Sequence, residues 1–174
     1  MTPVAKFEKV SLKQYIEDFK KLFPNLEYND NDLIMIEEIW NNIKLPTRSD
    51  PGSAGYDFYC NIPLMDLMPL QAFTIPTGIR CKIEDGWALL MLPRSGMGFK
   101  YGMRLHNTIG LIDSSYYNAD NEGHIMVKFS HVSENPINIQ VGDRFVQGIF
   151  VPYGITVDDD AQGTRTGGFG SSGN

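Results

Sequence analysis

Four short runs of the chain combine small residues with side chains that could do chemistry. They are residues 54–57 (AGYD), 93–96 (PRSG), 110–116 (GLIDSSY) and 167–173 (GGFGSSG). Small residues let backbone N–H groups approach a ligand closely, and such groups bind phosphate at turns. The remaining side chains suit phosphate, a metal ion, a sugar or a base. We therefore predict that the runs meet in a nucleotide site.

The third run carries the strongest candidate for a catalytic group. Asp113 follows the apolar pair Leu111 and Ile112 and precedes a polar segment that we interpret as a hairpin. A carboxylate in that setting is held rigidly and can orient a water molecule. Tyr116, three residues later, could lay its ring against a sugar.

The first two runs offer groups for phosphate and metal. Arg94 and Ser95 leave a predicted strand and enter a turn punctuated by glycine, which provides a guanidinium, a hydroxyl and backbone N–H groups. The alternative is an ordinary strand exit with a solvated Arg94 and a capping Ser95. Asp57 could assist a magnesium ion, although a lone aspartate at the start of a strand is more often a turn residue.

The C-terminal tail is rich in glycine, with five glycines among its last twelve residues. We expect residues 158–174 to be a flexible arm that orders on a ligand, because they have little to bury. Phe169 is hard to explain as core packing there, whereas an aromatic lid over a base or sugar explains it. The alternative is a tail without a function.

Composition limits the classes of protein. The chain of 174 residues is 42% hydrophobic, enough for one core. Its formal net charge of −6 argues against stable binding to nucleic acid or to an anionic membrane. Cys60 and Cys81 lack paired spacing, which favours buried thiols over a disulfide or a metal site. No apolar run approaches the roughly 20 residues of a membrane span and no signal peptide is visible, so we expect a cytoplasmic protein.

Apolar periodicity divides the chain into three parts. Residues 1–43 contain two amphipathic helices, the first from the cap Ser11 with Gln14 as its capping-box partner to Pro24, and the second capped by Asn29 or Asp30. Residues 44–157 read as short strands of a mainly β sandwich or barrel, and residues 158–174 form the arm. The helices would expose an apolar stripe if left alone, so we expect them to pack on the β domain or on a neighbouring subunit.

Together with residues 142–147 (GDRFVQ), the four runs resemble the five ordered motifs of the trimeric dUTPase family. The resemblance covers roughly residues 44–173 and includes the linking phrase at 73–79 (FTIPTGI). It implies a jelly-roll fold, a homotrimer in which three chains build each site, and Mg²⁺-dependent hydrolysis of dUTP to dUMP and pyrophosphate. Such an activity keeps uracil out of DNA and supplies dUMP for dTTP synthesis.

The resemblance also implies roles for the residues that match the motifs. Asp113 would orient and deprotonate the attacking water, and Tyr116 would pack on the deoxyribose and exclude a 2′-hydroxyl. Asp57 would support Mg²⁺ through water. The groups implied for phosphate are Arg94, Ser95, Gly96 and Gln147; those for uracil are Asn107 and Gly110; and those in the closing arm are Arg165, Phe169, Gly170 and Ser171.

Two features depart from the family pattern. Residues 117–122 are inserted between Tyr116 and Gly123, where the pattern reaches glycine after two residues. The inserted side chains are candidates for altered base specificity, although a solvated loop is favoured; they include Tyr117, Asp120 and Glu122. In the arm, Arg165 stands one place nearer the glycines than in many relatives.

Two other functions stay open at this point. A related dCTP deaminase would share the fold, but Asp113 and the stacking arm argue against it. A nucleotide-sensing regulatory protein could use the helical extension or the insert to bind a repressor-like partner. The three histidines have no metal spacing, and we interpret His106, His124 and His131 as structural.

Overall fold

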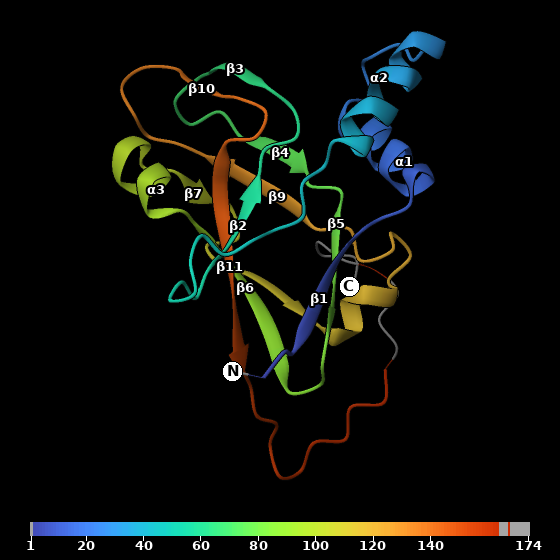
Figure 1. Ribbon diagram of the computed structural model, residues 1–174, viewed down its shortest axis with the longest axis vertical. Coiled ribbons are helices and arrows are strands. Elements are labelled where there is room, and N and C mark those ends of the chain that lie inside the picture. Colours follow the sequence, from blue (N-terminus) through green and yellow to red (C-terminus); the bar gives the residue numbers. More distant parts are fainter. Residues whose placement is uncertain (1, 164–166, 168–174) are drawn as a thin grey trace.

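The computed structural model of the chain describes residues 2–163 and 167, and its fold is mainly β (Figure 1). The helices are α1 (Leu12–Leu22), α2 (Asp30–Asn41), α3 (Ser95–Tyr101) and the 3₁₀ helix η1 (Ser114–Asn118). The strands are β1 (Ala5–Lys9), β2 (Tyr56–Tyr59), β3 (Leu64–Leu67), β4 (Phe73–Pro76), β5 (Ile79–Ile83), β6 (Trp87–Pro93), β7 (Arg104–Leu105), β8 (Gly110–Asp113), β9 (Met126–Ser130), β10 (Ile137–Ile139) and β11 (Arg144–Pro152).

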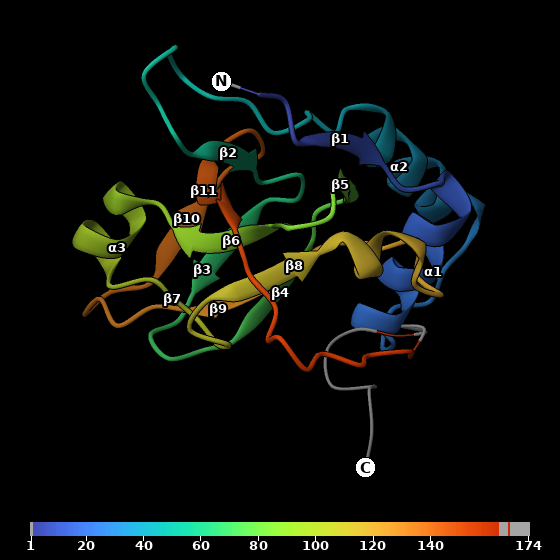
Figure 2. The ribbon, with the colours of Figure 1, turned by 90° about the horizontal axis from the view of Figure 1, so that it is seen from below.

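The central sheet has four antiparallel strands in the order β2-β11-β6-β8. A three-stranded sheet, β4-β9-β7, and two strand pairs, β1-β5 and β10-β3, complete the β structure (Figure 2). The long strand β11 pairs with β2 on one side and β6 on the other. It therefore lies between β2 and β6, and the phosphate-binding candidates lie where these three strands meet the end of β6.

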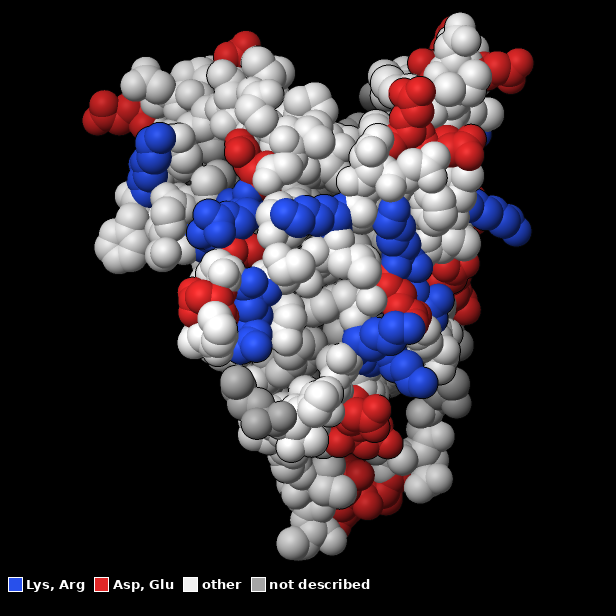
Figure 3. Space-filling model, viewed as in Figure 1, with Lys and Arg blue, Asp and Glu red and all other residues white. Residues whose placement is uncertain are grey.

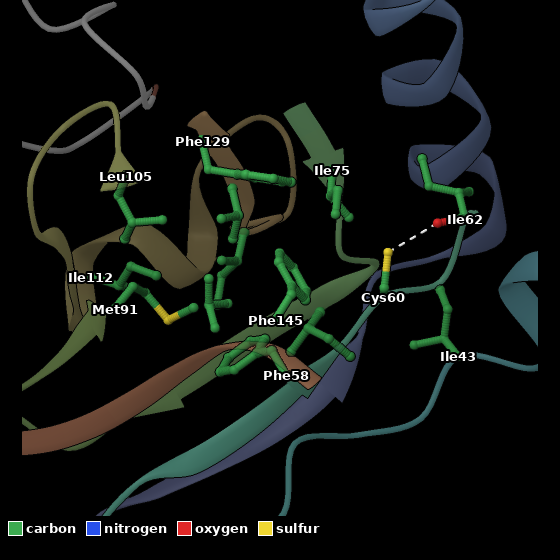
Figure 4. Packing of buried hydrophobic residues seen from close by; sticks show 14 of the residues in the cluster. Ile43, Phe58, Cys60, Ile62, Ile75, Met91, Leu105, Ile112, Phe129 and Phe145 are labelled. Carbon is green, nitrogen blue, oxygen red and sulfur yellow. Dashed lines mark hydrogen bonds between the residues drawn. The ribbon is translucent and has the colours of Figure 1, made fainter. Parts of the chain in front are cut away.

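The hydrophobic core fills the space between the sheets (Figure 4). Phe58, Phe129 and Phe145 from three different strands are buried in it. Cys60 and Cys81 are also buried, and neither forms a disulfide. Burial raises the pKa of both thiols to about 12. The prediction that the two cysteines are packing residues is confirmed.

Both helices of the N-terminal segment begin where the sequence predicts. The Ser11 side chain caps α1 by accepting from the Gln14 N–H, and Asn29 caps α2 in a complete capping box. The capping box predicted for α1 is only half formed. In a complete box the Gln14 side chain would accept from the Ser11 N–H. Here that N–H donates instead to the carboxylate of Glu122, at 2.8 Å.

The N-terminal segment is not wholly helical, since it begins with the strand β1. This strand pairs antiparallel with β5 from Ala5↔Ile83 to Lys9↔Ile79. The predicted apolar stripe of the two helices packs against the chain's own β structure, where Phe19 is buried and Phe23 lies against Phe73. The segment is therefore tied to the β domain both by a strand and by its helices.

Charges of both signs cover the face seen in Figure 3, with acidic side chains gathered over α2 at the upper right. This mixture agrees with the acidic net charge and shows no broad basic surface on that face. Among the described residues, no helix has the length and apolar character needed to cross a membrane.

Candidate active site

Three of the sequence motifs meet around the carboxylate of Asp57. Asp57 is 6% exposed and lies in β2, paired with Gln147 of β11. Its Oδ1 forms an ion pair with Nε of Arg94 at 2.8 Å, and its Oδ2 accepts a hydrogen bond from Nη1 of Arg144 at 3.1 Å. A buried carboxylate paired with two guanidiniums holds both in place and leaves their other N–H groups for an anion.

Gln147 joins this group through close packing with the first motif. Its Nε2 donates to the Pro93 carbonyl at 3.3 Å. A Cβ on Gly55 would lie 2.7 Å from the Gln147 side-chain oxygen, so a larger residue at position 55 would displace that amide. The glycine of the first motif therefore leaves room for the side-chain amide of Gln147 in its present position.

The second motif continues into a helix rather than the predicted turn. Ser95 and Gly96 open α3 and are exposed, and Cβ atoms on Gly96 and Gly98 would meet open space. The helix ends at Gly102, whose φ of 62° is the left-handed conformation that glycine adopts readily. A cavity of about 370 Å³ lies beside this segment, lined in part by Arg94, Gly96 and Arg144.

A second cavity, of about 160 Å³, lies under the third motif. Its lining includes Asn107, Gly110 and Tyr116, the residues implied for uracil and deoxyribose. Tyr116 is 4% exposed and its hydroxyl donates to the His124 carbonyl at 2.8 Å. Gly110 is buried against Met91, where a Cβ would lie 2.9 Å from the Met91 Cβ. This pocket has an apolar floor with a few polar groups, as nucleotide base pockets do.

Asp113 stands at the last position of β8, where it pairs with Ala88, and it caps η1. Its Oδ1 accepts from the Ser115 N–H at 3.1 Å and from the Ser115 hydroxyl. The predicted hairpin after it is instead the helix η1, because this cap turns the chain into helical geometry. These bonds restrict the orientation of the carboxylate, while the catalytic role of Asp113 stays a prediction.

The inserted residues do not form a solvated loop as favoured from the sequence. The Tyr117 hydroxyl donates to Glu8 at 2.6 Å, and Arg80 lies over the Tyr117 ring at 3.6 Å. Glu122 accepts from Ser11, and Ala119 between them is buried, whereas Asp120 is exposed. The insert is docked on the N-terminal segment by hydrogen bonds to Glu8 and Ser11, and on β5 by Arg80, which lies 3.8 Å from Glu122.

The two halves of the site lie at opposite ends of β6. Asp113 pairs with Ala88 near the start of this strand, and Arg94 follows its end, six positions after Ala88. At about 3.3 Å per residue, six positions of a strand span about 20 Å. Asp113 and Arg94 therefore lie at backbone positions that are far apart in one chain.

The described residues contain no group of three or more His, Cys, Asp or Glu side chains that could hold a metal ion. Asp57 has both oxygens bonded to arginines, which does not fit a direct metal ligand. His124 and His131 are buried and hydrogen-bonded, while His106 is exposed. The structural role expected for the histidines is seen for His124 and His131, which are buried and hydrogen-bonded.

The remaining site predictions fall on the C-terminal arm. Arg165, Phe169, Gly170 and Ser171 lie outside the described residues.

Sequence reasoning missed two residues of the site. Arg144 lies in the fourth motif, but the sequence analysis gave it no role. Its position three residues before the phosphate candidate Gln147 was a usable signal. Lys128 lines the second cavity from β9 and had no signal in the sequence.

Comparison with known proteins identifies the family. The dUTPase family model matches residues 41–173. The chain is 39% identical over 134 residues to the deoxyuridine 5′-triphosphate nucleotidohydrolase of Lactococcus lactis subsp. lactis, a match that covers 75% of this chain and 89% of that protein. The chain belongs to the dUTPase family.

Solved structures agree with this membership. The crystal structure of the dUTPase from Streptococcus mutans superposes with a TM-score of 0.61 at 27% identity, covering 88% of this chain and 98% of that one. A Staphylococcus bacteriophage 80alpha dUTPase superposes with a TM-score of 0.61 at 16% identity, covering 95% and 100%, which shows a shared fold. The predicted dUTPase-type β fold is confirmed, and the enzyme is a dUTP diphosphatase that converts dUTP to dUMP.

Proposed function

We propose that this dUTPase hydrolyses dUTP to dUMP and pyrophosphate by in-line attack of water on the α-phosphorus, with Asp113 as the general base. The observation that carries the proposal is the Asp113 carboxylate, fixed by the β8 ladder and by the Ser115 cap at the edge of the Tyr116 pocket. A general base must be held within hydrogen-bond reach of the proton that it takes.

The remaining residues bind and orient the nucleotide in this proposal. Uracil enters the cavity beside Asn107 and Gly110, and the Tyr116 ring packs on the deoxyribose, leaving no space for a 2′-hydroxyl. Phe169 of the arm stacks on the base, and Arg165, Gly170 and Ser171 of the arm add contacts to the nucleotide.

The cradle at the end of β6 holds the triphosphate. Arg94, Ser95 and Gly96 bind phosphate oxygens, and Gln147 adds a contact from β11. Arg94 and Ser95 stabilise the charge that develops on the leaving pyrophosphate, since groups fixed in advance do this without reorganisation. The ion pair of Asp57 with Arg94 supports this role because it fixes the guanidinium before the substrate binds.

We propose that Mg²⁺ binds together with the nucleotide. This ion usually keeps several waters and is bound by one or two carboxylates together with substrate phosphates. We assign Asp57 a contact through water and a positioning role toward Arg94 and Arg144, because both of its oxygens are already bonded. When bound, Mg²⁺ would neutralise phosphate charge.

We further propose a homotrimer whose sites are shared between chains. The separation of about 20 Å between Asp113 and Arg94 along β6 supports it, because attack requires the water to approach phosphorus to about 3–3.5 Å. One chain then supplies the base pocket and Asp113, a second supplies the cradle, and the arm of a third closes the site. A cytoplasmic location stays a prediction, supported by the free thiols of Cys60 and Cys81.

The test is pyrophosphate release from dUTP, UTP, dTTP and dCTP, with Mg²⁺ present or chelated. We expect turnover of dUTP alone, its dependence on Mg²⁺, and a loss of about 10³-fold or more in kcat for Asp113→Asn with dUTP binding retained. Asp120→Asn, on the exposed part of the insert, is the matched control. Loss of dUTP binding in Asp113→Asn would contradict the role of this residue.

A further inference from the structure

The buried residue His124 links helix α1 to Tyr116, which lines the cavity proposed to hold the deoxyribose and is called the sugar pocket below. The His124 side chain is 0% exposed, and both ring nitrogens are hydrogen-bonded. Its Nε2 accepts from the Gly78 N–H at 2.7 Å, and because a backbone N–H can only donate, the ring proton is on Nδ1. Nδ1–H then donates to Asp18 of α1 at 2.8 Å.

The backbone of the same histidine holds the tyrosine of the pocket. The Tyr116 hydroxyl donates to the His124 carbonyl at 2.8 Å, and Asn121 donates to that hydroxyl at 2.8 Å. Gly123 links the two at a φ of 69°, where a Cβ would lie 2.6 Å from the Tyr116 carbonyl oxygen. The turn between them is closely packed. We therefore expect a displacement of His124 to displace the Tyr116 ring as well.

A second set of bonds ties the insert to the N-terminal segment. Glu8 of β1 accepts from the Tyr117 hydroxyl, and Ser11 donates to Glu122 through both its N–H and its hydroxyl. Arg80 of β5 donates to the Tyr117 carbonyl at 3.1 Å. These bonds fasten the residues on the C-terminal side of Tyr116 to β1, β5 and the start of α1.

We propose that Asp18 and His124 are positioning residues for Tyr116, and that the N-terminal segment thereby sets how strictly the sugar pocket excludes a 2′-hydroxyl. This inference rests on the proposed contact of Tyr116 with deoxyribose. The extension and the insert then work as a pair: α1 holds the turn at His124, and the insert fastens that turn to β1 and to the N-terminus of α1.

The experiment compares kcat/KM for dUTP and UTP in the full-length enzyme and its variants. Asp18→Ala removes the acceptor for His124, and we expect the ratio of the two constants to fall about tenfold, because small displacements of positioning groups cost that much or more. The change should appear in KM for dUTP, with kcat within about threefold, since the β8 ladder holds Asp113 independently.

Two variants separate positioning from general damage. Asp18→Asn keeps an oxygen that can accept from Nδ1–H, and we expect it to retain most of the selectivity. Glu17→Ala removes an exposed carboxylate from the same helix and should leave the ratio unchanged. Tyr117→Phe removes only the hydroxyl bonded to Glu8 and should lower the ratio about threefold, which provides the test if Asp18→Ala does not fold.

An unchanged ratio in Asp18→Ala, whatever happens to its thermal stability, would overturn the inference. So would an equal loss of selectivity in Asp18→Asn and Glu17→Ala. Binding of dUDP and UDP, measured by calorimetry on the same variants, gives the sugar selectivity without turnover. If the wild-type enzyme failed to turn over dUTP, the proposed function would fail, while the ratio of the two dissociation constants would still test the positioning of Tyr116.

Discussion

The carboxylate of Asp57 in β2 and the guanidinium of Arg94, the residue that follows β6, form an ion pair of 2.8 Å. The pair joins the first motif to the second, and Arg144 completes it from the other side. The carboxylate is buried while the arginines are partly exposed, so the pair directs positive charge toward solvent. This arrangement supports the proposal that the two arginines bind the triphosphate.

Asp57→Asn should therefore weaken nucleotide binding more than it slows chemistry. We expect the KM for dUTP to rise about tenfold and the free energy of unfolding to fall by about 1–3 kcal/mol, because two guanidiniums lose a buried, charged acceptor. Steady-state kinetics and urea unfolding measure the two effects. Asp66→Asn, on the exposed part of β3, is the control, and equal effects of the two substitutions would contradict the argument.

Two inactive variants should restore activity to each other if Asp113 and Arg94 of different chains meet in one site. Co-expression of differently tagged Asp113→Asn and Arg94→Ala chains, followed by purification on both tags, yields mixed trimers. Each mixed trimer then has a complete pair at one of its three sites, and we expect about one third of wild-type kcat.

The control for this experiment pairs Asp113→Asn chains with chains that carry both substitutions. Such trimers never contain an intact Asp113 and must stay inactive. Activity of the mixed trimers no greater than that of either single variant would mean that each chain uses its own two residues.

Acid should release the N-terminal segment before the β domain unfolds. Burial raises the pKa of Asp18, but hydrogen bonds from His124 and Gln14 outweigh it and hold the pKa below its usual range. The pKa of Glu122 is also lowered, since the bonds from Ser11 outweigh its burial. A carboxyl group whose pKa is lower in the folded state than in the unfolded state stabilises the fold at pH values above its unfolded-state pKa of about 4. That stability is lost as the pH falls through the folded-state pKa.

Trp40 reports this release, because its indole N–H donates to the Val10 carbonyl at 2.9 Å. In a Trp87→Phe background, we expect Trp40 fluorescence to change below about pH 4, ahead of the loss of β-sheet circular dichroism. In Asp18→Asn the Trp40 fluorescence should depend less steeply on pH, since one of the titrating groups is absent. Coincident transitions by both probes would show that the segment and the domain unfold together.

The two thiols should be inert in the native enzyme. Burial raises the pKa of Cys60 and Cys81 to about 12, so the thiolate fraction at pH 8 is about 10⁻⁴. We expect no alkylation by iodoacetamide over hours in buffer and modification of both residues in guanidinium chloride, as read by intact mass. Fast modification of either cysteine in the native enzyme would mean that the core around it opens readily.

Periodicity and motifs predicted the parts of the structure that depend on neighbours in sequence. The stripe of α1 and its Ser11 cap, the cap of α2, and the strands around residues 87–92 and 145–151 all follow from local spacing, and each is confirmed. The strand β1 was missed, because five residues of mixed polarity form a strand only when β5 is there to pair with them.

The candidate site was harder to predict, because its contacts join distant positions. Nothing local indicates that Asp57 accepts from Arg144, 87 residues later. The docking of the insert also depends on long-range charge pairs, so its length alone suggested a solvated loop. The division of the chain at residues 43 and 157 stays a prediction, as do the roles of the motif residues.

Several contacts of the N-terminal segment can form only after residues far along the chain have been synthesised. Its bonds to the turn around Tyr116 join residues 106 to 111 positions apart. At about 5–20 residues per second, the ribosome needs about 5–20 s to produce that length. The apolar face of α1 must wait for its partners during that interval, so chaperones that bind nascent apolar segments have a target at the front of the chain. Helix α1 is therefore synthesised well before the residues that it contacts around Tyr116, and these contacts must form late in folding.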